Sequence, residues 1–260
     1  MSFFLLAQAD PVGRDLLKKL VVARYGGSPP ALDTLRVKFQ GRSRAQVWGF
    51  QMWARVEATA TYQFPDRYRW DFSLRLLRVL RSSFTTSFDG SAVYEQRGLR
   101  ATRDAEAEAV ESARRRAWAE TVFFVSPLIV NERVRVEGID MSSFRAIRPG
   151  GSVENAAIVR LDEQHRLREI EIERMDPADG LPKRQCLRPS GDLVRVDGLV
   201  LPQRVGRFWD DELFMELSPV GAELNPELSP DDFVLKTETI DDILTEDDTA
   251  SAADGETPDR

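Results

Sequence analysis

Residues 54–64 alternate between apolar and polar side chains, and no other feature constrains the possible folds of this chain as strongly. Successive side chains of a β-strand point to opposite faces, so this pattern predicts a strand with one face against a core and the other in water. The apolar members of the pattern are Ala54, Val56, Ala58, Ala60, Tyr62 and Phe64.

The same alternation recurs along most of the chain. It resumes after Pro65-Asp66 with Tyr68, Trp70 and Phe72. Further predicted strands cover 133–137, 153–161, 167–172, 193–196, 204–208 and 213–217. Residues that favour turns lie between them, at 89–90, 149–151, 162–165, 190–191 and 210–211. Short strands separated by turns predict a long antiparallel meander.

Two segments have helical periodicity instead. Residues 11–25 form an amphipathic pattern that begins after Asp10, a good N-cap, and ends at Gly26-Gly27. Residues 104–120 carry a stripe of alanines, with acidic residues first and three arginines, 114–116, last. A shallow alanine stripe lets a helix pack closely against a sheet. We interpret the second helix as ordinary packing, with a movable cover as the alternative.

The charge of the chain is concentrated at its C-terminal end. The net charge is −7, yet residues 236–260 contain nine acidic and two basic residues, which leaves the rest of the chain neutral. Without a concentrated excess of Lys and Arg, nucleic-acid binding is not expected. The tail has too little apolar surface to fold, so a disordered acidic tail is predicted.

The first nine residues, MSFFLLAQA, resemble the end of a secretory signal. The segment has no positively charged start and its apolar run is short, so either the beginning is truncated or the resemblance is accidental. We favour an extracytoplasmic location, with a cytoplasmic one as the alternative. No window approaches the roughly 18 apolar residues of a membrane-spanning helix. The predicted division is therefore a signal remnant at 1–9, one domain at 10–235 and a tail at 236–260.

Enzyme and metal motifs are not found. The sequence has no phosphate-binding loop, no GxSxG and no GxGxxG, and its single histidine, His165, excludes every multi-histidine metal site. His165 lies in a polar predicted turn. The single cysteine, Cys186, excludes an intrachain disulfide and lies on a predicted strand, where a structural thiol is expected. We predict no catalytic residues, no cofactor and no bound metal.

The order of the predicted elements, together with several turn motifs, resembles the lipoprotein-localisation family of LolA/LolB-like outer-membrane lipoprotein carriers. The motifs that carry the resemblance are Pro65-Asp66-Arg67-Tyr68-Arg69, Phe88-Asp89-Gly90, Ala92-Val93-Tyr94, Val196-Asp197-Gly198-Leu199-Val200-Leu201-Pro202, Phe208-Trp209-Asp210-Asp211-Glu212, Glu223-Leu224-Asn225-Pro226 and Asp232-Phe233. The resemblance implies an α+β fold in which a strongly curved antiparallel sheet forms a half-open barrel. An N-terminal helix and an internal helix would cover its concave face, which would hold acyl chains. The sequence departs from the family at Asp210-Asp211, where relatives often have Asp-Gly, and it lacks a lipobox cysteine.

These expectations lead to two functional hypotheses. The first is non-enzymatic binding of lipid or lipoprotein acyl chains, as a carrier or sensor, because exposed acyl chains need a dry apolar groove. The predicted lining is Val56, Ala58, Tyr62, Phe64, Tyr68, Trp70 and Phe72. The second is a protein-interaction module of the envelope that acts through a sheet edge or the acidic tail.

One arginine-rich stretch has two interpretations. Residues 74–81 carry Arg75, Arg78 and Arg81 among leucine and valine. They are candidates for contact with an anionic membrane surface. Alternatively they are solvated arginines of a hairpin, which we favour because eight residues make a short anchor.

Overall fold

The computed structural model of the protein describes residues 10–47, 50–76, 80–98, 100–130, 133–177 and 179–236. The predicted signal remnant at 1–9, Arg78 and residues 237–260 of the predicted tail lie outside the described residues. In the described part of the chain, no helix combines the length and the apolar character that crossing a bilayer requires.

Within the described residues, one antiparallel sheet holds thirteen strands in the order β6-β5-β4-β3-β2-β1-β13-β12-β11-β10-β9-β8-β7. Their bounds are β1 Thr34–Val47, β2 Phe50–Gln63, β3 Arg67–Leu76, β4 Leu80–Phe88, β5 Val93–Arg97, β6 Arg100–Asp104, β7 Arg135–Gly138, β8 Ser143–Ile147, β9 Ala157–Leu161, β10 Leu167–Met175, β11 Pro182–Val196, β12 Leu199–Trp209 and β13 Glu212–Leu224. The sheet does not close, because its edge strands β6 and β7 do not pair with each other. The predicted α+β fold, a curved and half-open antiparallel barrel, is confirmed.

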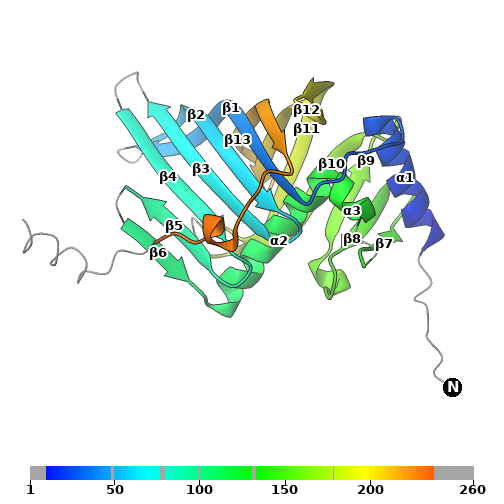
Figure 1. Ribbon diagram of the computed structural model, residues 1–260, viewed down its shortest axis with the longest axis horizontal. Coiled ribbons are helices and arrows are strands. Elements are labelled where there is room, and N and C mark those ends of the chain that lie inside the picture. Colours follow the sequence, from blue (N-terminus) through cyan, green and yellow to red (C-terminus); the bar gives the residue numbers. More distant parts are fainter. Residues whose placement is uncertain are drawn as a thin grey trace, which may run out of the picture.

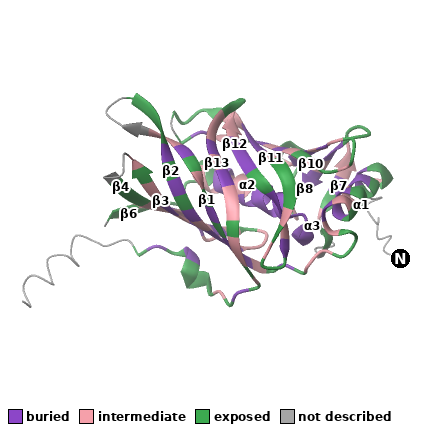
Figure 2. Ribbon diagram, turned by 90° about the horizontal axis from the view of Figure 1, so that it is seen from above, coloured by how far each residue is buried: buried purple, intermediate pink, exposed green. Residues whose placement is uncertain are grey.

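The two halves of the chain meet in the middle of the sheet. Hairpins link β1 to β6 in succession, and β7 to β13 in the same way, so the one pairing between distant parts of the sequence is β1 with β13. The helices α2 (Ala107–Phe124) and α3 (Ser126–Val130) connect the two edges of the sheet. The sheet curves around α2, which lies on its concave side (Figures 1 and 2).

Helix α1 spans Pro11–Tyr25, with the bounds that the sequence predicts. The side chain of Asp10 accepts a hydrogen bond from the Val12 N–H, and Gly26 ends the helix in the left-handed conformation. The helix packs on β7 and β8, and Gly13 allows the close approach. A Cβ at this position would lie 2.9 Å from the Gly138 nitrogen.

Helix α2 begins and ends later than the 104–120 predicted from the alanine stripe. The residues up to Asp104 belong to β6, because they pair with β5. The helix continues to Phe124, since Val122, Phe123 and Phe124 are buried in the core. The periodicity of the sequence does not reveal that these three residues are buried, because the strands that cover them come from distant parts of the chain.

Other strand predictions need smaller corrections. Residues 153–155 form a 3-10 turn, so the strand predicted at 153–161 begins at Ala157. The predicted turn at Ser190-Gly191 lies inside β11, where the pairing with β12 shifts in register. No strand was predicted for β4, β5, β6 or β8. In β4, for example, consecutive Ser and Thr residues obscure the alternation.

The C-terminal segment after β13 packs across the outer face of β3 and β4. Phe233, in the 3-10 turn η2 (Pro230–Phe233), is fully buried, and the Ser87 hydroxyl donates to its carbonyl oxygen at 2.6 Å. Leu235 forms a small second cluster with Ala92 and Tyr94. These contacts extend the ordered structure to the predicted domain end at 235, while the division of the chain itself stays a prediction.

Candidate functional site

The concave face of β1–β4 is mostly apolar, with Ser43, Ser82 and Thr86 as polar side chains in the same rows. In β2, buried side chains alternate with exposed or half-buried ones from Ala54 to Ala60, and in β3 the buried side chains alternate with half-buried ones. The register places Val56 opposite Leu74 and Phe72 opposite Phe84, so these rows share one face. We call this surface the β1–β4 wall, which consists of Phe39, Gly41, Ala54, Val56, Ala58, Ala60, Tyr62, Tyr68, Trp70, Phe72, Leu74 and Phe84.

The structure brings the predicted lining residues together on this wall. Val56, Ala58, Tyr62, Tyr68, Trp70 and Phe72 are buried there, and they belong to the main core cluster. Phe64 follows the end of β2, is half-buried, and stacks on Tyr62 with ring centroids 5.6 Å apart. Tyr62 and Phe64 both contact Phe124 of α2. That the set holds a ligand stays a prediction.

Stacked aromatic rings run across the wall from β1 to β4. Phe39 stacks on Trp70 at 5.5 Å, Trp70 on Phe72 at 5.3 Å, and Phe72 on Phe84 at 4.4 Å between ring centroids. Offset stacking adds to the free energy of area burial, so these rings hold one another in place. The small residues Gly41 and Ala58 lie on the same face of the sheet as these rings.

Along β2 the wall passes from buried to exposed without changing its apolar character. Ala54 is 1% exposed, but Met52 and Phe50, on the same face, are 38% and 73% exposed. Trp53, between them, points to the opposite face, where the Arg42 guanidinium lies 4.8 Å from its ring centroid. The wall therefore ends in an apolar rim formed by Phe50 and Met52.

At the inner end of the wall, three arginines face the concave side. Arg116 comes from α2, Arg174 from β10 and Arg207 from β12. The Arg207 guanidinium lies 4.6 Å from the Trp70 ring centroid, and that of Arg116 lies 4.6 Å from the Tyr68 ring centroid. We call Arg116, Arg174 and Arg207 the arginine cluster. The sequence pattern places Arg116 only at the basic end of a helix and indicates no role for Arg174 or Arg207.

Glu120 supplies negative charge to this cluster. Its carboxylate lies 2.6 Å from Nη2 of Arg207, with the two side chains 3% and 7% exposed, and it accepts a 3.3 Å hydrogen bond from the Tyr62 hydroxyl. Burial, followed by the charge of Glu120, raises the pKa of Tyr62 well above its usual value. Tyr62 therefore stays protonated at neutral pH and acts here as a hydrogen-bond donor.

The cluster retains unused hydrogen-bond donors. Burial, together with the charges of Arg116 and Arg207, lowers the pKa of Arg174 to about 10, so it remains a cation at neutral pH. Among the described residues, the Nε atoms of these three arginines and Nε1 of Trp70 are buried without a hydrogen-bond partner. Buried donors without acceptors are costly, so the region is suited to an acceptor or an anion. The sequence signal that could have identified the arginine cluster is a charged residue at a strand position whose neighbours two residues away face the core.

The arginines predicted to contact a membrane lie elsewhere. Arg75 is on the face of β3 opposite the wall, is exposed, and approaches Glu57 at 3.5 Å. Arg81 is its exposed partner across the β3–β4 pair, and Arg78 lies outside the described residues. The hairpin interpretation agrees with this arrangement, while contact with a membrane surface stays a prediction.

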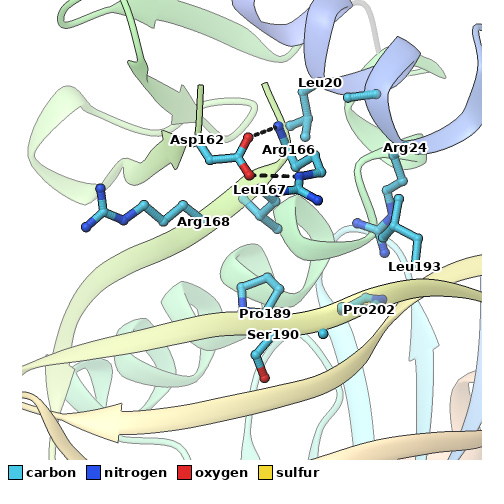
Figure 3. Close-up of a pocket in the computed structure, with 12 residues that line it drawn as sticks. Leu20, Arg24, Asp162, Arg166, Leu167, Arg168, Pro189, Ser190, Leu193 and Pro202 are labelled. Atoms are coloured by element: carbon cyan, nitrogen blue, oxygen red, sulfur yellow. Dashed lines mark hydrogen bonds and ion pairs between the residues drawn. The ribbon is translucent and has the colours of Figure 1, made fainter. Parts of the chain in front are cut away.

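A cavity of about 250 Å³ lies beneath α1, next to β10, β11 and β12 (Figure 3). Its lining joins apolar side chains, such as Leu20 and Leu193, to Arg24 and Arg166. It shares no residue with the β1–β4 wall or with the arginine cluster.

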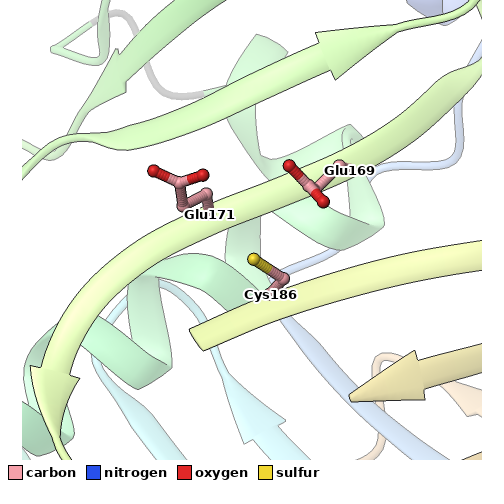
Figure 4. A group of neighbouring side chains, drawn as sticks. All are labelled: Glu169, Glu171 and Cys186. Atoms are coloured by element: carbon pink, nitrogen blue, oxygen red, sulfur yellow. The ribbon is translucent and has the colours of Figure 1, made fainter. Parts of the chain in front are cut away.

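Glu169, Glu171 and Cys186 lie within 4.8 Å of one another on β10 and β11 (Figure 4). Arg160 approaches the two carboxylates at 2.6 and 2.8 Å, so both are already in ion pairs. Burial and the neighbouring carboxylates raise the pKa of the Cys186 thiol to about 11, which disfavours the thiolate that a metal requires. This group is best explained as an ion-pair network beside a structural thiol.

His165 lies in the β9–β10 turn with a φ of 60°. This location agrees with the turn predicted at 162–165. Left-handed backbone is tolerated by such turn residues, and the position is remote from the β1–β4 wall.

Several solved structures are similar to this chain. A LolA superfamily protein from Nitrosomonas europaea is 11% identical with a TM-score of 0.46, and the match covers 86% of this chain and 97% of that one. A domain described as a putative outer membrane lipoprotein-sorting protein from Vibrio parahaemolyticus is 11% identical with a TM-score of 0.42, and the coverage is 85% and 95%. A DUF1329 family protein from Desulfovibrio piger is 12% identical with a TM-score of 0.45, and the coverage is 86% and 98%. The first of these belongs to the superfamily that the sequence motifs resemble.

Comparison with sequences gives a family for the chain. No curated protein matches it. The model described as "Family of unknown function (DUF6544)" matches residues 20–215, which extend from α1 into β13. Because this match covers most of the described sheet, the chain belongs to the DUF6544 family.

Proposed function

We propose that this protein binds acyl chains of lipids or lipoproteins along the β1–β4 wall, without catalysing a reaction, as an extracytoplasmic carrier or sensor. One observation carries the proposal: the wall continues, still apolar, from buried Ala54 to the exposed rim of Met52 and Phe50. Exposed apolar side chains that adjoin one another and a core, unlike singly exposed ones, are a feature of binding surfaces. The N-terminal segment MSFFLLAQA supports the location.

The energetics of acyl chains require such a surface. Each buried methylene contributes about 0.8 kcal/mol, so a chain of about 16 carbons loses roughly 13 kcal/mol when it is exposed to water. A carrier must cover the chain, yet it must also release it to a membrane that offers equal burial. A wall of rings and small residues with few polar groups can both cover the chain and release it, because its contacts are nonspecific and reversible.

The arginine cluster extends the proposal to the polar end of the ligand. It lies at the inner end of the wall, where Arg207 and Arg116 contact the rings of Trp70 and Tyr68. Its unused N–H groups suit the oxygen atoms of a carboxylate, phosphate or ester. An acyl chain that lies on the wall with its polar end at the arginine cluster would bury the apolar wall and supply acceptors to the unused N–H groups.

The alternative, an interaction module that docks partners on a sheet edge, has less support. The edge strand β7 is approached by α1, and its Gly138 N–H donates to Asp10. The other edge, β6, has five residues and carries Arg100, Arg103 and Asp104, a short charged edge that disfavours strand addition. The acidic tail after residue 236 lies outside the described residues, so docking through it stays a prediction.

The rim provides a direct test. We expect a fluorescent fatty acid to bind the wild-type protein, and the double variant Phe50→Ser/Met52→Ser to bind it about tenfold more weakly. A buried side chain of this size contributes about 1.5–3 kcal/mol, and tenfold corresponds to about 1.4 kcal/mol. Both side chains are exposed, so their replacement should not unfold the protein.

Trp53→Ser is the matched control, because Trp53 lies on the same strand but points to the other face. This variant should retain wild-type affinity. A natively purified protein that yields no extractable lipid and takes up no fluorescent fatty acid would argue against the proposal. Equal weakening by Trp53→Ser and by the rim variant would place binding elsewhere.

A further inference from the structure

The cavity beneath α1 combines apolar walls with positive charge. Its apolar lining includes Leu20 from α1, Leu167 from β10, and Pro189 and Leu193 from β11. The volume is about 250 Å³, below the roughly 300–1,000 Å³ of drug-sized sites. A small amphiphile therefore fits it better than a whole phospholipid.

Arg24 is the polar group that distinguishes this cavity from a packing defect. The residue is only 7% exposed. Nε donates to the Val200 carbonyl oxygen at 2.9 Å, and Nη1 donates to the Phe123 carbonyl oxygen at 2.5 Å. In the described part of the chain, Nη2 has no hydrogen-bond partner. Two backbone carbonyls thus hold the guanidinium in place and leave one donor of a buried cation unused.

The charges around the cavity are mostly positive. Arg24, Arg166 and Arg168 line it together with a single carboxylate, Asp162. Asp162 is already engaged, since Nε of Arg166 lies 2.8 Å from it and the Arg166 backbone N–H donates to it at 2.9 Å (Figure 3). The guanidinium of Arg24 therefore has no carboxylate among the lining residues to pair with. A buried cation of this kind favours an anion with at least one oxygen acceptor.

We propose that this cavity is a second binding site, which takes a small monocarboxylate with an apolar chain. The carboxylate accepts the free N–H of Arg24, and the chain lies against Leu20, Leu167 and Leu193. This site does not depend on the function proposed for the β1–β4 wall, because the two surfaces share no residue.

Calorimetric titration of the full chain with octanoate tests the proposal, with octanol as the uncharged analogue. We expect one saturable octanoate site per chain that persists in the rim variant, and at least tenfold weaker binding of octanol at that site. Leu193→Trp should fill the cavity and reduce octanoate affinity at least tenfold. Arg24→Met should do the same by removing the cation, but it also removes two hydrogen bonds to backbone carbonyls that stabilise the fold. Leu193 is 39% exposed, so Leu193→Trp remains informative if Arg24→Met fails to fold.

Two controls separate this site from others. Leu181→Trp adds the same ring at a side chain that is 57% exposed and does not line the cavity, and it should leave octanoate affinity unchanged. The rim variant Phe50→Ser/Met52→Ser should also retain it. Octanol that binds as tightly as octanoate would overturn the proposal, as would octanoate affinity that survives Leu193→Trp. Loss of octanoate binding in the rim variant, with retention in Leu193→Trp, would assign the ligand to the wall instead.

Discussion

Glu120 and Arg207 form an ion pair that is almost fully removed from water, with side chains 3% and 7% exposed. The pair joins α2 to β12 across the concave side, and the Tyr62 hydroxyl completes it from β2. Two buried charges lose their hydration, which their mutual attraction only partly restores. We infer that this pair fixes one arrangement of α2 on the sheet and adds little net stability.

We expect Glu120→Leu to lower the free energy of unfolding by about 3–5 kcal/mol, because it leaves Arg207 buried without its carboxylate. The double variant Glu120→Leu/Arg207→Met should recover most of this loss, since neither charge then remains. Urea denaturation followed by fluorescence measures the free energy of unfolding of the single and the double variant. A single variant that loses less than about 1 kcal/mol, or a double variant less stable than the single one, would contradict the assignment of the pair as buried and coupled.

At the scale of elements, α1 depends on one carboxylate for two contacts. Asp10 caps the helix through the Val12 N–H and also accepts a hydrogen bond from the Gly138 N–H of the edge strand β7. These bonds, led by that from Gly138, lower the pKa of Asp10 below its ordinary value of 3.8. The ionised carboxylate thus helps to hold α1 against the edge of the sheet.

This contact should make stability depend on acid pH. Because the folded pKa of Asp10 is lowered, its contribution is complete above the unfolded value of 3.8 and is lost as the pH falls through the folded value. We expect Asp10→Ala to have a lower Tm than the wild type at pH 6, and the difference should shrink towards pH 2. Thermal unfolding at several pH values measures it. A difference that is constant over this range would show that the charge of Asp10 has no role.

At the scale of the whole molecule, the sheet is completed by segments that are distant in sequence. Strand β1 pairs with β13, and the side chain of Asn225 accepts from the Asp33 N–H and donates to the Ala31 carbonyl oxygen. The segment that follows covers the outer face of β3 and β4 with Phe233. The C-terminal part of the described chain is therefore part of the fold.

Two truncations test this conclusion. A chain that ends at Lys236 should keep the wild-type Tm and the fatty-acid affinity expected of the wall. A chain that ends at Asn225 should be less stable by about 3–5 kcal/mol or more, since burial of Phe233 alone accounts for a loss of that size. Circular dichroism during thermal unfolding compares them. Equal stability of the two truncated chains would contradict the packing of residues 226–236. If fatty-acid binding is lost when residues 237–260 are removed, the acidic tail has a role in binding.

The sequence alone determined those features whose causes lie within a few residues. Asp10, Pro11 and Gly26 predicted both ends of α1. Asp210-Asp211 predicted a turn, and in the structure both residues have positive φ. The alternation from Ala54 to Phe64 identified which side chains share the concave face, because pleating depends only on neighbours along the strand. The grouping of the predicted lining on β2 and β3 followed from the same local rule.

Only the tertiary structure decided the features that depend on contacts between distant residues. The pairing of β1 with β13, the extension of α2 to Phe124 and the inward position of Arg174 and Arg207 all result from burial by other parts of the chain. Local alternation can mark a charged residue as inward, as for Arg207 two residues after buried Val205, but it does not identify the distant groups that pack around that residue. The period of the side chains therefore determined the faces of the sheet, and long-range packing decided what those faces enclose.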